Sequence, residues 1–213
     1  MKLIAIRHGE TEWNTQGREM GQLDSPLTSQ GVRQAHAIAR RLSRISFSAL
    51  YSSDLGRAVT TAEIIGACCG RSVRIDPGLR ERHMGIFQGL TVAEMRERFP
   101  KERQDYERIG FEYVIPGGES AKQRLQRSVR VLTAIAERHP GDTIVAVTHG
   151  GFLMGFFESV LGLQPGNGWR FKRHNGSYSV FEYSSGRWSL EVWNDIGHLD
   201  GTETLDDPTI QAQ

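Results

Sequence analysis

Two histidines in this chain of 213 residues each follow a short apolar run. His8 comes after Leu3–Ile6 and Arg7, and His149 comes directly after Thr143–Thr148. Such runs are typical of buried strands in a parallel sheet, where the residues just beyond the strand ends line the ligand site. An imidazole at such a place can act as a nucleophile or a base near neutral pH. For Arg7 and His8 alone, the simpler interpretation is the start of a polar loop.

Arginine supplies the positive charge beside these histidines. Arg7 precedes the first of them, and Arg57 lies in the first turn of a predicted helix, where the helix dipole disfavours a cation. Arg57 is then either a surface arginine paired with Asp54 or Glu63, or an anion clamp assisted by the helix N-terminus. Two arginines would repel a divalent metal, whereas the planar guanidinium fits phosphate well. The combination therefore favours an oxyanion, above all phosphate, and no metal.

The elements that must position these residues follow from hydrophobic periodicity. Apolar residues at helical spacing predict helices near 28–42, 55–69 and 120–138, and a further helix from Phe152. Short apolar or alternating runs predict strands at 3–6, 47–51, 72–75, 143–148, 178–183 and 188–193. This alternation predicts an α/β fold, a three-layer sandwich with a mainly parallel central sheet and helices on both faces. We expect a single domain over residues 1–213.

Two segments are expected to lie outside this regular pattern. Thr11–Arg18 is polar and is interpreted as a loop over the strand end, in which Asn14 either donates to a ligand or holds a turn. Within 91–118, a short helix should stop at Pro100, and the highly charged Lys101–Tyr113 shows weak periodicity. We expect 91–118 to be an exposed excursion, helical in part, that serves as a lid or specificity element.

Composition narrows the classes of partner and the cellular setting. The net charge is +1, which favours neither nucleic acid nor an anionic membrane as a partner. The two cysteines, Cys68 and Cys69, are adjacent and make neither a disulfide framework nor a set of metal ligands. The N-terminus lacks a signal-peptide pattern, and the longest apolar region, 152–163, is too short to span a bilayer. We therefore expect a cytoplasmic protein. The oligomeric state stays open, with a homodimer among the alternatives.

Five short motifs, in this order, resemble the histidine phosphatase superfamily, the phosphoglycerate mutase-like family of phosphatases and mutases. Any one of them alone would be weak, but five in the right order are highly specific. The similarity runs from residue 3 to about residue 198 and implies a phosphoglycerate mutase-like fold. The motifs are Arg7–Thr11, Trp13-Asn14, Ser53–Ala58, Glu81-Arg82 and Thr148–Gly151.

The resemblance implies a role for each motif. His8 would be the nucleophile that forms a phosphohistidine, and Glu81 would be the general acid and then the general base. For Glu81 alone, between two arginines, a surface ion pair is the commoner outcome. The resemblance also implies a small phosphorylated metabolite as substrate, with no metal and no cofactor. Arg7, Arg57 and His149 would hold the phosphoryl group, and Asn14 and Gly150 would add substrate contacts.

Phosphatases and mutases of this family differ in whether water or a second substrate hydroxyl takes the phosphoryl group. Mutases that use 2,3-bisphosphoglycerate as cofactor carry a longer insertion with two adjacent arginines between the acid and the second histidine. Here 68 residues separate Glu81 from His149, and Arg108 is followed by Ile109. The stretch 24–28 also resembles the phosphatase branch, whereas 81–83 and 85–90 resemble the mutases. We expect a metal-independent phosphatase for small phosphomonoesters, with the mutase as the alternative.

A third hypothesis is a catalytically silent binding module on the same scaffold. Such a module would be expected to lack one of His8, Glu81 and His149, and all three are present. The leaving group stays undetermined, and sugar phosphates, glycerate or amino-acid phosphates, and nucleotides are all open. Specificity is expected to depend on 103–113, the loop after Asn14 and 194–199.

Overall fold

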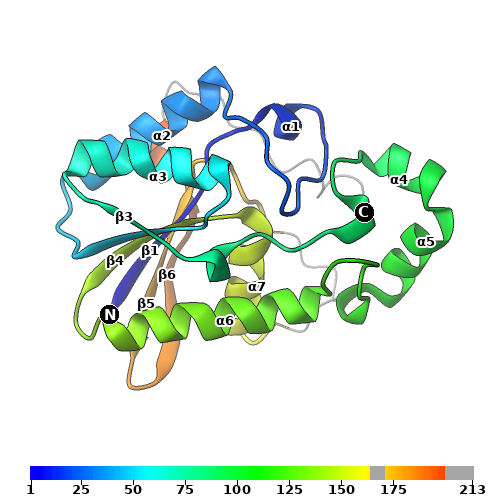
Figure 1. Ribbon diagram of the computed structural model, residues 1–213. Coiled ribbons are helices and arrows are strands. Elements are labelled where there is room, and N and C mark those ends of the chain that lie inside the picture. Colours follow the sequence, from blue (N-terminus) through cyan, green and yellow to red (C-terminus); the bar gives the residue numbers. More distant parts are fainter. Residues whose placement is uncertain (164–170, 200–213) are drawn as a thin grey trace.

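The structure is a computed structural model of the chain and describes residues 1–163 and 171–199. The described residues form one six-stranded sheet with the strand order β3-β2-β4-β1-β5-β6 (Figure 1). The first four of these strands run parallel to one another, and a hairpin adds two antiparallel strands at one edge. The strands are β1 (Lys2–Arg7), β2 (Ala49–Ser52), β3 (Val73–Ile75), β4 (Thr143–Thr148), β5 (Tyr178–Ser184) and β6 (Arg187–Asp195).

Helices cover both faces of this sheet (Figure 1). Successive side chains of a strand point to opposite faces, so Leu3 and Ala5 pack on one side and Ile4 and Ile6 on the other. The predicted three-layer α/β fold is therefore confirmed. The side of Ile4 carries α2 (Ser29–Leu42) and α3 (Gly56–Cys69), and the side of Leu3 carries α6 (Ala121–Arg138) and α7 (Gly150–Val160).

Local signals in the sequence set the ends of several elements. The Thr28 hydroxyl accepts the N–H of Gly31 at 3.0 Å and caps α2, and Gly70 ends α3 with a φ of 62°. Ser185 and Gly186 both have positive φ, as a tight two-residue hairpin turn between β5 and β6 requires. No helix within 1–163 and 171–199 is long and apolar enough to cross a membrane.

The expected loop at Thr11–Arg18 is wrong for four residues, which form the short helix α1 (Glu12–Thr15). The Thr11 hydroxyl accepts the N–H of Asn14 at 3.2 Å, and Asn14 Oδ1 accepts the N–H of Thr11 at 3.1 Å. This reciprocal capping stabilises a single turn that is too short to show hydrophobic periodicity.

The segment 91–118 is largely helical, and most of its side chains are exposed or half-buried. It contains α4 (Val92–Arg98) and α5 (Pro100–Ile109), and Pro100 is the first residue of α5, where a missing N–H is tolerated. Arg103 is only 5% exposed, and its guanidinium lies 5.1 Å from the centre of the Tyr106 ring. Tyr106 packs on a separate apolar cluster of Met84, Phe87, Met95 and Ile115. Because charged residues dominate this segment, its periodicity did not predict that its aromatic side chains pack on an apolar cluster.

An ion pair ties this segment to the loop after α1. Arg18 Nη1 lies 2.7 Å from Glu94 Oε2, and Arg18 also forms an isolated β-bridge with Thr91. The backbone N–H of Thr91 and the Arg18 guanidinium lower the pKa of Glu94 to about 2. Short single-turn helices complete the described chain at Pro77–Leu79, Gly85–Phe87, Gly110–Glu112 and Gly197–Leu199.

Candidate active site

The carboxyl ends of β1 and β4 bring the two histidines together. These strands are adjacent, and Arg7 pairs with Thr148 at their ends. The ring centres of His8 and His149 are therefore only 5.2 Å apart, with the ring planes tilted by 58°. Both side chains are buried, at 2% and 0% exposure.

The chain around His8 orients its imidazole. Nδ1 lies 2.8 Å from the carbonyl oxygen of Gly9, and because a carbonyl can only accept, the proton of a neutral ring lies on Nδ1. Nε2 then carries the lone pair and accepts the Nε–H of Arg57 at 3.3 Å. Gly9 must be glycine here, since a Cβ would lie 2.4 Å from the carbonyl oxygen of Gly31.

Asn14 and Asn175 link the histidine to the turn that follows it. Asn175 Nδ2 donates to the His8 carbonyl oxygen and to Asn14 Oδ1, both at 3.2 Å. Asn14 Oδ1 also accepts from Thr11, so its carbonyl oxygen is occupied within the protein. Any contact between Asn14 and a ligand would therefore come from its amide Nδ2.

Arg57 reaches the site from the first turn of α3. Its partner is Asp24, at 3.2 Å from Nη1, and neither Asp54 nor Glu63, as the surface interpretation assumed. Asp54 instead pairs with Arg80 at 2.5 Å. Burial lowers the pKa of Arg57, while the negative charges of Asp24 and Glu81 act in the opposite direction.

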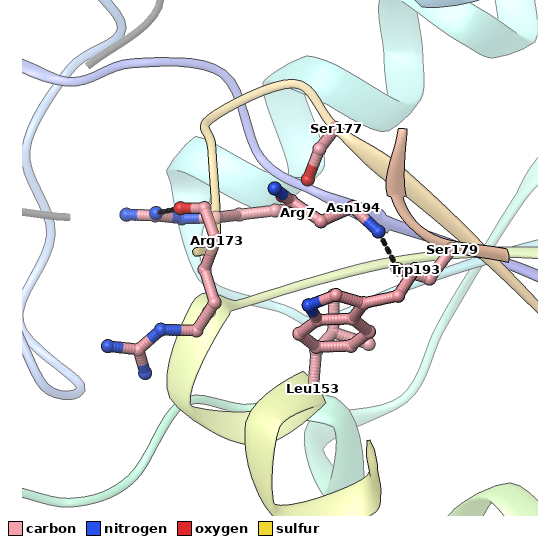
Figure 2. Close-up of a pocket in the computed structure, with 8 residues that line it drawn as sticks. Arg7, Leu153, Arg173, Ser177, Ser179, Trp193 and Asn194 are labelled. Atoms are coloured by element: carbon pink, nitrogen blue, oxygen red, sulfur yellow. Dashed lines mark hydrogen bonds between the residues drawn. The ribbon is translucent and has the colours of Figure 1, made fainter. Parts of the chain in front are cut away.

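Arg7 extends from the end of β1 across the start of α7. Its Nη1 donates to the backbone carbonyl of Arg173, as Figure 2 shows. A Cβ on Gly150 would lie 3.2 Å from Arg7 Nε, so the glycine lets the guanidinium lie close to the helix. Arg7 forms one wall of a small pocket that is also lined by Trp193 and Asn194 (Figure 2).

Glu81 is held at the N-terminus of α7 and makes no ion pair with the residues that the structure describes, in contrast to the surface ion pair considered from sequence. Its Oε2 accepts the N–H of Gly151 and its Oε1 accepts the N–H of Arg82, both at 2.7 Å. Gly151 leaves room for this carboxylate, since a Cβ there would lie 2.5 Å from Oε1. Arg127 from α6 donates to the Glu81 backbone carbonyl at 3.1 Å and steadies this segment.

His149 differs from His8 in its hydrogen bonds. Both ring nitrogens of His149 are buried without a hydrogen-bond partner among the described residues. Burial, followed by the positive charges of Arg57 and Arg7, holds the pKa of His149 well below its usual range. Its imidazole is therefore neutral, with one N–H to donate. A buried polar group without a partner costs about 1–3 kcal/mol, which a bound oxyanion would offset.

The model of the histidine phosphatase superfamily (branch 1) matches residues 3–196. The chain belongs to the histidine phosphatase superfamily. It is 38% identical over 208 residues to phosphoglycerate mutase-like protein 4 of Arabidopsis thaliana, covering 96% of this chain and 89% of that one. It is 37% identical over 201 residues to a metal-independent phosphoserine phosphatase of the same plant, covering 93% and 83%. The solved structure of Bacillus stearothermophilus YhfR superposes with a TM-score of 0.86 at 31% identity, covering 93% and 98%.

Several residues that support the site of this histidine phosphatase were given no role from its sequence, although Asp24 begins the stretch 24–28 that resembles the phosphatase branch. Asp24 and Arg127 act through contacts with segments far away in the chain, so no local spacing marks them. Asn175 precedes a glycine, which marks a turn but not its bond to His8. Within 1–163 and 171–199, no three His, Cys, Asp or Glu side chains gather as a metal site.

Proposed function

We propose that this superfamily member is a metal-independent phosphatase that hydrolyses small phosphomonoesters through a phosphohistidine on His8. The observation that supports this most directly is the pairing of the two histidines. His8 carries its lone pair on Nε2, beside the Nε–H of Arg57, and both ring nitrogens of the neighbouring His149 are buried without a partner among the described residues. A phosphoryl group between them would meet a nucleophile on one side and a donor on the other.

In the first step, His8 Nε2 attacks the phosphorus atom, the N–P bond forms and the ester P–O bond breaks. Phosphoryl transfer depends mainly on positioning and charge stabilisation. Arg7, Arg57 and the N–H of His149 would offset the negative charge on the phosphoryl oxygens. Asn14 Nδ2 and the start of α7 at Gly150 would add donors at the same group.

Glu81 would serve both halves of the reaction. As a general acid, it gives its proton to the oxygen of the leaving alcohol as the P–O bond breaks. As a general base, it then takes a proton from the water that attacks the phosphohistidine, which breaks the N–P bond and releases inorganic phosphate. Its position beside Gly151, two residues after His149, supports this role.

The mutase that uses 2,3-bisphosphoglycerate remains the second candidate, favoured by the segment 81–83 and by similarity to a phosphoglycerate mutase-like protein. Two adjacent arginines that hold a second acidic group would be expected in that case. Arg108 is an exposed side chain that pairs with Asp105 at 2.6 Å, and Ile109 follows it. Similarity to a phosphoserine phosphatase also supports hydrolysis. The proposed setting is the cytoplasm, with a small phosphorylated metabolite as partner and neither nucleic acid nor membrane.

The test is inorganic phosphate release from a panel of phosphomonoesters, including phosphoserine and 3-phosphoglycerate, with a chelator present. We expect rapid release that the chelator does not slow and that His8→Ala abolishes, and the best ester would identify the substrate class. Absence of release from every ester would contradict the phosphatase. Isomerisation of phosphoglycerate that depends on 2,3-bisphosphoglycerate would then establish the mutase.

A further inference from the structure

Asp24 caps the helix that carries Arg57. The N-cap residue of α3, Leu55, makes no side-chain hydrogen bond, so the first N–H groups of the helix need another acceptor. Asp24 supplies it from a loop more than thirty residues earlier in the chain. Its Oδ2 accepts the N–H of Gly56, and its Oδ1 accepts the N–H of Arg57 at 3.2 Å. The carboxylate also compensates for the unfavourable position of a cation at a helix N-terminus.

The same loop holds the end of the Arg57 guanidinium. Nη1 donates to Asp24 Oδ1 at 3.2 Å and to the Leu23 carbonyl at 2.7 Å, and Nη2 donates to the Gly21 carbonyl at 2.8 Å. Because the guanidinium is planar, fixing Nη1 and Nη2 also fixes the direction of the Nε–H. That N–H points to His8 Nε2 at 3.3 Å.

The loop is itself anchored beside the predicted general acid. Gln22 N donates to Gln88 Oε1 at 2.7 Å, and Gln22 Nε2 donates to the Glu81 backbone carbonyl at 3.1 Å. Gly21 has a φ of 54°, and a Cβ there would lie 2.5 Å from Gln88 Oε1, which leaves the loop little freedom. Asp24 therefore sits on a fixed support, although its own side chain is 41% exposed.

We infer that Asp24 is a positioning residue, whose carboxylate fixes Arg57 so that its Nε–H points to the His8 nitrogen where phosphoryl transfer occurs. This inference rests on the proposed function only in naming phosphoryl as the group that is transferred. The orientation of Arg57 should matter for any oxyanion at this site. Asp24 acts through Arg57 and has no contact of its own with the substrate.

The decisive variant is Asp24→Asn, because asparagine caps a helix about as well as aspartate but lacks the charge that holds Nη1. We expect its affinity for orthovanadate and its kcat/KM for a phosphomonoester each to fall on the order of tenfold or more, since small misplacements of a positioning group are costly. In an Arg57→Ala background, Asp24→Asn should cause no further loss. Asp76→Asn is the matched control, because Asp76 caps a single-turn helix by accepting the N–H of Gly78 at 2.8 Å.

The outcomes separate this inference from the proposed function. Unchanged orthovanadate affinity in Asp24→Asn, with or without a lower Tm, would overturn the inference and leave Asp24 a helix cap only. Equal losses from Asp24→Asn in the presence and absence of Arg57 would overturn it as well. If the wild-type protein binds orthovanadate but hydrolyses no ester, the proposed function fails, and the effect of Asp24→Asn on orthovanadate affinity still decides the role of Asp24.

Discussion

The ends of β1 and β4 carry the same residue type in nearly the same environment, yet the two histidines are prepared differently. His8 has Nδ1 on the Gly9 carbonyl and Nε2 on Arg57. His149 is entirely buried, and neither ring nitrogen has a hydrogen-bond partner in the described part of the chain. The protein therefore orients one imidazole itself and leaves the other to be completed by a ligand.

This difference separates a nucleophile from a donor. A nucleophilic nitrogen must be unprotonated and held in place, and the bond from Nδ1 to the Gly9 carbonyl achieves both for Nε2 of His8. A group that stabilises a transition state should instead make its best contact only when the phosphoryl group is present. His149 meets that condition because nothing described in the protein competes for its ring nitrogens.

The largest expected effect is that of His8→Ala. Without the nucleophile, kcat for a phosphomonoester should fall on the order of 10⁴-fold or more, because the covalent pathway is lost. Steady-state phosphate release measures it, and the exposed His36→Ala serves as the matched histidine control. Substantial residual turnover in His8→Ala would contradict the assignment of His8 as the nucleophile.

His149→Ala should be less severe, with kcat reduced on the order of 10²–10³-fold, as for loss of one donor to a developing oxyanion. The variant should still form the phosphohistidine on His8. Rapid-quench detection of acid-labile phosphoprotein in a single turnover tests this. If the folded variant forms no phosphoprotein, His149 is needed for the first step as much as His8. That result would contradict the separate roles of nucleophile and donor.

Gly151→Ala tests the support that the start of α7 gives to the general acid. Alanine favours a helix, but its Cβ would displace the Glu81 carboxylate from a position 2.5 Å away. We expect a normal Tm and a loss of about tenfold in kcat/KM for an alkyl phosphate, with a smaller loss for 4-nitrophenyl phosphate, whose leaving group needs less protonation. Ser159→Ala, exposed on the same helix, is the control. Equal losses on both esters would exclude an effect through the acid.

The smallest effect is on stability. Because burial depresses the pKa of His149 in the folded state, the unfolded chain binds a proton below about pH 6.5 that the folded chain does not. The free energy of unfolding should therefore fall as the pH drops below 6.5, by at most about 1.4 kcal/mol per pH unit for this group. Denaturant unfolding of wild type and His149→Gln between pH 8 and 5 measures it, and a slope that the substitution leaves unchanged would contradict a neutral, buried His149.

Much of the fold could be predicted because apolar periodicity is local. The runs at 3–6 and 143–148 are buried strands, and the parallel sheet follows from their alternation with amphipathic helices. Short or charged elements could not be predicted in this way. Reciprocal capping of Thr11 and Asn14 stabilises α1, and α5 is stabilised by the partly buried Tyr106, whose ring lies near arginines of two different segments.

By itself, the sequence determined which residue types stand at the carboxyl ends of two buried strands, and therefore that His8 and His149 lie at the same edge of the sheet; their adjacency depends on the strand order, which the structure supplies. Parallel strands in one sheet necessarily end at a common edge. The tertiary structure alone decided that Arg57 pairs with Asp24, that Nε2 of His8 faces Arg57, and that Glu81 rests on Gly151. Contacts between segments tens of residues apart depend on the packing of whole elements, which local periodicity does not encode.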